Sequence, residues 1–282
     1  AMALAGEATL ARDADGWSVR TPGLSIRGDE LRLHARGGIG FQRNGGRPRL
    51  DLATDIEDLP LASARGYWLH QLMPKATIDW LDMALQGGTL RGLHAVLAGD
   101  LDDWPFRDEA GRAGAGSFLA QARIEQGLVK FHRDWPAAEA VDAEVRFKAD
   151  GFSVQGRGRI AGVPITAISG GIPNFRRAEL SLQARASGDA RDFLTLLRQS
   201  PLQAQHRDTL DNLGAAGPAS TELELLLRLH RQQPPKRRLD GRLELAGASL
   251  RDERWQLAFD RVRGSARYDL QGFAAEGLQV LH

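Results

Sequence analysis

The stretch LPLASARGYWLHQLMPKATIDWLDMALQGGTLRGLHAVLAGDLDDWPF, residues 59–106, decides the fold because the hydrophobic period changes within it. Apolar residues at helical spacing predict a short helix over residues 76–86, namely Ile78, Leu81 and Leu85. Gly87-Gly88 is expected to end this helix, and another short helix is expected over residues 63–72. Residues 89–99 then alternate as a strand does. The stretch is therefore a helical insert in a chain that otherwise consists of strands.

Strands are predicted on both sides of this insert. Before it, residues 6–58 divide into six short alternating runs, separated by turn signals such as Pro22-Gly23 and Gly37-Gly38. After it, the alternation is clearest over residues 141–148, where one face carries Val141, Ala143, Val145 and Phe147. Consecutive strands joined by tight turns indicate an antiparallel meander.

Short helices recur in the second half of the chain. Residues 189–199 carry apolar side chains at helical spacing, and Ser187 or Asp189 can cap this helix. A second helical piece is expected over residues 204–213. We therefore expect one continuous, elongated unit with five segments: strands in 1–58, the helical insert in 59–106, strands in 107–186, short helices in 187–216 and strands in 217–282.

The sequence repeats itself at long range. Residues 146–156 match residues 267–277 at an offset of 121, since 267 − 146 = 121. Upstream, Gly127 and Trp135 match Gly247 and Trp255 at an offset of 120. Residues 14–19 also match residues 149–154. A long period in a β chain predicts a quasi-repetitive, elongated architecture.

The composition excludes several classes of function. The net charge of +1, from 37 basic and 36 acidic residues, does not indicate a nucleic-acid partner. The absence of cysteine excludes disulfides, cysteine-ligated zinc and thiol catalysis. The seven histidines are scattered, and Asp102-Asp103 is expected to turn the chain rather than to bind a cation. We therefore expect no catalytic residue, no metal and no cofactor.

The apolar faces of the predicted strands mix large residues with alanine and glycine. Protein interiors are packed as densely as organic crystals, and faces of this composition fill such an interior poorly. The two predicted helices are too short to cover a dozen strands, and an uncovered apolar face favours aggregation. Something apolar is therefore expected to occupy it.

Residues 59–106 resemble the central region of the YhdP-like proteins of the AsmA-like superfamily, which includes TamB. The resemblance rests on Leu59-Pro60, Trp80-Leu81, the run from Leu85 to Gly88, and the run from Leu97 to Phe106. It implies a long, strongly twisted antiparallel sheet curled into an open, U-shaped groove. The family is implicated in passing phospholipids from the inner to the outer membrane of Gram-negative bacteria, across the periplasm.

In such a groove, the apolar faces of the alternating strands would hold the lipid. Acyl chains are expected on the groove-lining residues Val141, Ala143, Val145, Phe147, Val154, Ile160, Leu180, Leu182, Leu223, Leu225, Leu227, Leu243 and Leu245. Transfer would be passive, with no covalent step. The inner-membrane anchor of the family is not seen in this sequence, which we expect to be a fragment of a larger protein. Envelope proteins are expected as further partners.

Two other classes of function remain open. A structural or interaction β-scaffold of the cell envelope would have its apolar face covered by helices or a partner, and would carry no lipid. A carbohydrate-active enzyme would need clustered acidic and aromatic residues, and aromatic residues are only 6% of the chain. Lipid that co-purifies with the protein would distinguish a lipid-transport protein from a scaffold without lipid.

Overall fold

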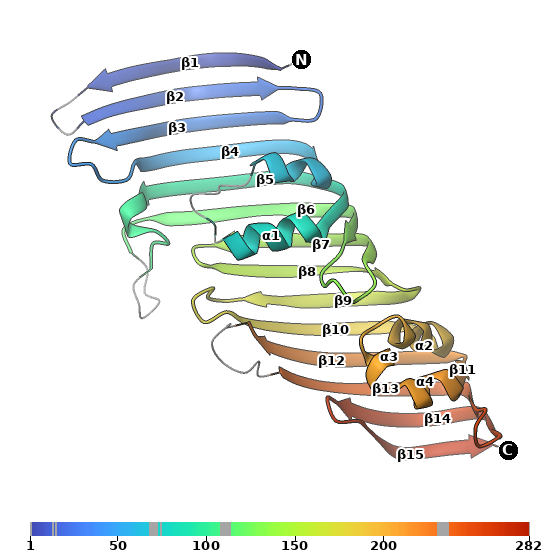
Figure 1. The fold of residues 1–282 in the computed structure, drawn as a ribbon. Coiled ribbons are helices and arrows are strands. Elements are labelled where there is room, and N and C mark those ends of the chain that lie inside the picture. The colour runs from blue at the N-terminus through green and yellow to red at the C-terminus, as the bar shows by residue number, and fades with distance from the viewer. Residues whose placement is uncertain are drawn as a thin grey trace.

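The computed structural model describes residues 2–12, 14, 16–67, 73, 75–107, 114–229 and 237–281. It shows one long antiparallel sheet in which almost every strand pairs with the strands before and after it in sequence (Figure 1). Only β11 leaves this order, because it pairs with β13. The strands are β1 (Ala3–Arg12), β2 (Gly16–Arg27), β3 (Arg32–Gln42), β4 (Arg49–Pro60), β5 (Leu85–Asp100), β6 (Ser117–Val129), β7 (Ala138–Lys148), β8 (Gly151–Ile160), β9 (Val163–Ile172), β10 (Glu179–Asp189), β11 (Leu213–Ala216), β12 (Pro218–Arg228), β13 (Arg237–Asp252), β14 (Leu257–Asp269) and β15 (Phe273–Leu281).

The helices are short and lie on one side of the sheet (Figure 1). Their bounds are η1 (Leu61–Tyr67), α1 (Lys75–Ala84), η2 (Leu101–Asp103), α2 (Ala190–Arg198), α3 (Leu202–Gln205) and α4 (Arg207–Asn212). The expected helix over 63–72 corresponds to the 3-10 helix η1, and residues 68–72 lie outside the described part of the chain. The helix expected over 189–199 is α2, and Asp189 caps it by accepting a hydrogen bond from Arg191 N.

Several predicted boundaries are wrong, and glycine is the common reason. Pro22-Gly23 and Gly37-Gly38 were expected to be turns, but they lie inside the long strands β2 and β3. Pro22-Gly23 falls at a shift in the β2–β3 register, and Gly37 has φ 121°, so both regions accommodate irregular backbone without ending a strand. The predicted exit Gly87-Gly88 is likewise part of β5, which begins at Leu85 directly after α1.

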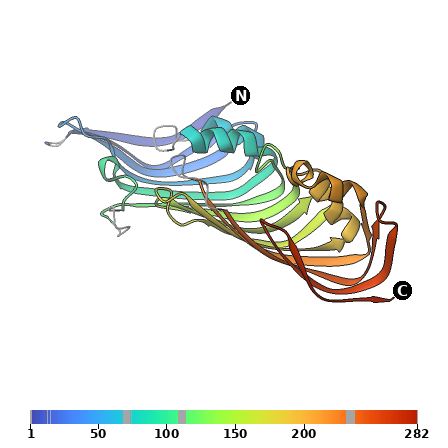
Figure 2. The same cartoon turned by 60° about the horizontal axis from the view of Figure 1, so that its bottom comes forward.

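The sheet is twisted and curls toward the side that carries the helices, as Figure 2 shows. Its first and last strands, β1 and β15, do not pair, so the sheet stays open and does not close into a barrel. The fold expected from the sequence, a long and curled antiparallel sheet with a few short helices, is confirmed. We call the helix-bearing side the inner face and the opposite side the outer face.

The sequence repeat corresponds to a structural repeat. Strands β2, β8 and β15 each carry an aromatic residue at their first or second position, which is Trp17, Phe152 or Phe273. Two helical insertions separate neighbouring strands, namely β4 from β5 and β10 from β12. In both insertions the carbonyl of the last helical residue accepts a hydrogen bond from the residue that follows a later strand. Ala84 O, at the end of α1, accepts from Lys130 N after β6 at 2.8 Å. Asn212 O, at the end of α4, accepts from Glu253 N after β13 at 3.0 Å. The unit β2–β7 therefore recurs as β8–β14.

Candidate functional site

The inner face of the sheet carries continuous apolar rows that cross many strands. Partners in an antiparallel ladder lie on the same face, so the register of the strands traces each row. The central row joins β7 to β13 and consists of Val145, Val154, Gly170, Leu182, Leu225 and Leu239. A neighbouring row consists of Phe147, Phe152 and Ile172. Another consists of Ala143, Gly156, Ile168, Ala184, Leu223 and Gly241.

The thirteen residues predicted to line a groove all lie on this face. Ala143 is buried, and the other twelve are half-buried. The intervening residues of the same strands, such as Glu144, Arg146 and Glu224, are exposed. The structure does not leave all thirteen equally accessible, because helices cover part of the face.

Helix α1 covers the inner face near β5–β7. Leu81 of α1 is in one buried cluster with Leu61, Leu85 and Ile124, and Val141 and Val145 pack against this cluster. The indole N–H of Trp80 donates to Phe131 O at 3.1 Å, which fixes α1 to the loop after β6. Val141 and Val145 therefore support a helix, in addition to any role in a binding surface.

Helix α2 covers a second part of the inner face. Ala190 of α2 is buried with Ala219 and Ala248, and Leu243 and Leu245 pack against this cluster. Small residues at the contact let the helix approach the sheet closely. The Asp189 carboxylate accepts hydrogen bonds from Arg191 N at 2.8 Å and Gly217 N at 3.1 Å. These backbone bonds lower the pKa of Asp189 and hold the start of α2 against the break between β11 and β12.

The Leu-Asp-Asp-Trp-Pro-Phe run packs over the opposite ends of β5 and β6. Phe106 is buried with Leu97 and Leu101, and Trp104 and Phe118 pack against them. The rings of Trp104 and Phe106 meet edge to face, with centroids 5.4 Å apart. The Asp102 carboxylate accepts Arg47 N, so it turns the chain as the sequence predicts. This run is a structural plug at one end of these strands.

Between the areas covered by α1 and α2, the inner face of β8–β12 and the adjoining ends of β7 and β13 stay uncovered. Of the predicted residues, this area holds Phe147, Val154, Leu180, Leu182, Leu223, Leu225 and Leu227. Sequence reasoning missed Ile172, because the strand was expected to end at residue 168 whereas β9 continues to Ile172. Two glycines of these rows, Gly156 and Gly170, add no side chain to the floor at those points.

One hydroxyl pair interrupts the apolar floor. Thr221 and Tyr268 share a hydrogen bond of 2.8 Å, and Tyr268 lies over Gly241. Burial raises the pKa of Tyr268, so its phenol stays neutral at physiological pH. The floor therefore carries no charge at this point.

The outer face is covered by ion pairs between neighbouring strands. Arg91 contacts Asp58 and Glu125, and its hydrogen bond to Glu125 is the largest cause of its raised pKa. Arg123 pairs with Glu144, and Arg185 pairs with Glu222. These pairs are well exposed, so each contributes little stability. They make the outer face hydrophilic in contrast to the inner one.

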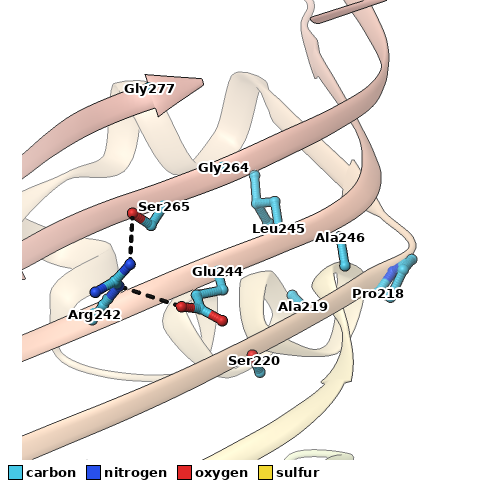
Figure 3. A pocket seen from close by; sticks show the side chains of 10 residues that line it. All are labelled: Pro218, Ala219, Ser220, Arg242, Glu244, Leu245, Ala246, Gly264, Ser265 and Gly277. Atoms are coloured by element: carbon cyan, nitrogen blue, oxygen red, sulfur yellow. Dashed lines mark hydrogen bonds and ion pairs between the residues drawn. The ribbon is translucent and has the colours of Figure 1, made fainter. Parts of the chain in front are cut away.

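Two hollows are open to solvent, and neither has the chemistry of an active site. One, of about 500 Å³, brings together Arg242, Glu244 and Ser265 of the outer face (Figure 3). Arg242 contacts the Glu244 carboxylate and the Ser265 hydroxyl, both at 3.4 Å. The other, of about 790 Å³, is lined mainly by glycines of β3 and of residues 99–116. Across the described residues, no three His, Asp or Glu side chains come close enough to hold a metal ion.

A family model described as YhdP protein matches residues 1–281. The chain belongs to the YhdP family. Over 227 residues it is 25% identical to the Intermembrane phospholipid transporter YhdP of Escherichia coli (strain K12). That match covers 80% of this chain and 18% of the relative, so the chain spans under a fifth of that protein. No solved structure matches the chain.

The YhdP family assignment confirms the resemblance carried by residues 59–106. In this member of the family, the stretch supplies α1 and the plug around Phe106. Its described residues hold the sheet and the helices together. None of the described helices is both long and apolar enough to span a bilayer.

Proposed function

We propose that this chain is a lipid-binding segment of a phospholipid transport protein in the envelope of Gram-negative bacteria. The observation that carries the proposal is the uncovered apolar face of β8–β12, which lies between two helix-covered areas of one open sheet. Acyl chains would occupy this face and their headgroups would remain in water. The match to a relative named as an intermembrane phospholipid transporter supports this cargo.

The proposed mechanism is passive. Apolar surface removed from water contributes about 25 cal/mol per Å², so acyl chains on this floor are strongly favoured over water. The rows are continuous from β7 to β13, so a chain can move from strand to strand with little change in contact. No covalent step, metal or cofactor is needed for such transfer.

The proposed location is the periplasm, with inner-membrane anchoring through a part of the full-length protein outside this sequence. Lipid would pass between the inner and outer membranes. Other envelope proteins are proposed as partners at either membrane, and nucleic acid is not.

Native mass spectrometry with lipid extraction tests the proposal, using a matched pair of variants on β12. Leu225 lies in the central inner row, whereas Leu226 lies on the outer face opposite Ser181 and Arg238. We expect phospholipid to co-purify with the wild-type protein and with Leu226→Glu, and to be lost in Leu225→Glu. Equal lipid content in the two variants, each still folded by circular dichroism, would contradict the assignment of the face.

A β-scaffold without lipid cargo is the second candidate. It is favoured by the helices, which already cover Val145, Leu243 and Leu245 with protein. In that case the purified protein would be free of lipid and would associate through the uncovered face. Concentration-dependent oligomers that Leu225→Glu abolishes would favour this candidate over transport.

A further inference from the structure

The two ends of the strands differ between β7 and β13. At one end the connections carry α2, α3 and α4, which cover the inner face (Figure 1). At the other end no helix covers the described residues. We call this end the open rim; it consists of the turn at 148–151, the loop at 173–178, and residues 228–229 and 237–238.

The open rim is cationic. It carries Lys148, Arg176, Arg177, Arg228, Arg237 and Arg238, all exposed. Three carboxylates at or beside the rim are held by arginines: Asp150 lies 3.4 Å from Arg107, Glu179 lies 3.1 Å from Arg228, and Asp240 lies 2.6 Å from Arg238. The positive charge of Lys148, Arg177 and Arg237 is not neutralised by these pairs.

The apolar floor leads directly to one of these cations. Arg237 pairs with Leu227, and Leu227 pairs with Leu180, so the three residues lie on the inner face in one row. Leu229, which directly follows β12, is 51% exposed at the same rim. An apolar surface that ends in a cation is complementary to a phospholipid, whose apolar acyl chains end in an anionic phosphate.

We propose that the open rim binds the phosphate of a phospholipid headgroup, with Arg237 and Arg177 as its principal cations. The acyl chains would then lie along β12 and β13, toward α2. This inference rests on the proposed function. It adds to that function the end of the strands at which the headgroups lie. Arginine suits the role because its guanidinium stays charged and matches the geometry of phosphate oxygens.

The length of the floor fits this orientation. Leu243, where the area covered by α2 begins, lies six positions after Arg237. At a rise of about 3.4 Å per residue, the floor between them is roughly 20 Å long. One leaflet of a bilayer has a hydrocarbon depth of about 15 Å, half of the usual 30 Å, so the acyl chains end before α2.

The end of the sheet that carries the helices lacks this charge. Residues 189–212 contain four aspartates and three arginines. One of the three, Arg198, donates to Leu210 O at 2.7 Å and Leu213 O at 2.8 Å, so its guanidinium holds α2 to the end of α4. A phosphate placed here would meet no excess of positive charge, and α2 would separate it from the floor.

The test compares charge reversal at the two ends. Arg177→Glu/Arg237→Glu reverses the open rim, and Arg191→Glu/Arg207→Glu makes the same change of net charge beside the helices. Binding of dioleoyl phosphatidylglycerol and of dioleoylglycerol, which has no phosphate, is measured by native mass spectrometry. We expect the open-rim variant to bind phosphatidylglycerol roughly three- to tenfold more weakly and dioleoylglycerol as the wild type does. The control variant is expected to bind both lipids normally.

Three outcomes would overturn the inference. The open-rim variant could bind phosphatidylglycerol as tightly as the control does, or it could lose both lipids equally while remaining folded. Inorganic phosphate could also compete with phosphatidylglycerol at equal concentration, which would make the rim a site for free anions. A wild-type protein that binds neither lipid would overturn the proposed function itself, and so differs from these three. If the charge-reversal variant does not fold, Arg177→Gln/Arg237→Gln replaces it in the same measurement, with a smaller expected effect.

Discussion

Gly116 shows how closely individual residues are fitted around the Leu-Asp-Asp-Trp-Pro-Phe run. A Cβ atom added at Gly116 would lie 2.1 Å from a ring carbon of the buried Phe106. The ring must therefore move if any side chain is present. Gly272, by contrast, has nothing within 4 Å of an added Cβ.

We predict that Gly116→Ala lowers the free energy of unfolding by about 1–3 kcal/mol, because overpacking displaces Phe106 from its cluster. Gly272→Ala is the control and is expected to change it by less than about 0.5 kcal/mol. Urea unfolding followed by tryptophan fluorescence measures both. Equal stability of the two variants would show that the ring is not held against this glycine.

The Asp189 carboxylate is expected to make the stability of the fold depend on pH. Its pKa is lowered in the folded state by hydrogen bonds from Arg191 N and Gly217 N. Its contribution to stability is therefore present above the unfolded pKa, near 3.9, and is lost as pH falls through the lowered folded value. We expect the wild type to be more stable than Asp189→Asn at pH 7, and the difference to vanish at the acidic end of a series of urea unfolding curves. A difference that does not depend on pH would contradict this role of the carboxylate.

At the scale of elements, α1 is held to the sheet by few residues. Leu81 is its main buried contact with Ile124, whereas Lys75 lies at the exposed start of the helix. Val145, which the sequence placed in the groove, packs against this same cluster. Helix attachment and surface lining therefore overlap at this position.

Leu81→Ala is predicted to lower the free energy of unfolding by about 2–4 kcal/mol, since it leaves a cavity between α1 and β6. Lys75→Ala is expected to have almost no effect, because its i, i+4 pair with Asp79 is exposed. Thermal and urea unfolding check both variants. A mild effect of Leu81→Ala would mean that α1 is not a fixed cover of the inner face.

The strands and their faces could be predicted from sequence because a period of two is set by the pleat itself. Val141, Ala143, Val145 and Phe147 lie on one face, as their alternation implies. Boundaries at glycine could not be predicted, because Gly37 and Gly88 permit bulges that look like turns in sequence. The positions of the helices could not be predicted either, because they depend on contacts between residues far apart in the chain. Helix α1 lies over Val145, and α2 lies over Leu243 and Leu245.

At the scale of the whole molecule, the sheet is nearly one-dimensional. Strands that are neighbours along the path from β1 to β15 are hydrogen-bonded to each other, and the path never returns on itself. The stability of such an array is roughly a sum of local terms. The clusters under α1 and α2 lie within the array, and its two edges have none.

We therefore predict that amide hydrogen exchange is graded along the sheet. β1 and β15 should exchange fastest, and β5, β6 and β12 slowest, because the latter lie under helices. Exchange measured by mass spectrometry at peptide resolution gives this profile. Uniform protection from β1 to β15 would indicate a single cooperative unit instead.

The most direct test of a lipid-bearing inner face is photo-crosslinking along β12 in cells. A photoreactive phenylalanine analogue is placed at each position from 222 to 227 in turn, and lipid adducts are identified by mass spectrometry. We predict adducts at positions 223, 225 and 227 and none at 222, 224 and 226, because the two sets face opposite sides of the sheet. Adducts at both sets, or at neither, would contradict it.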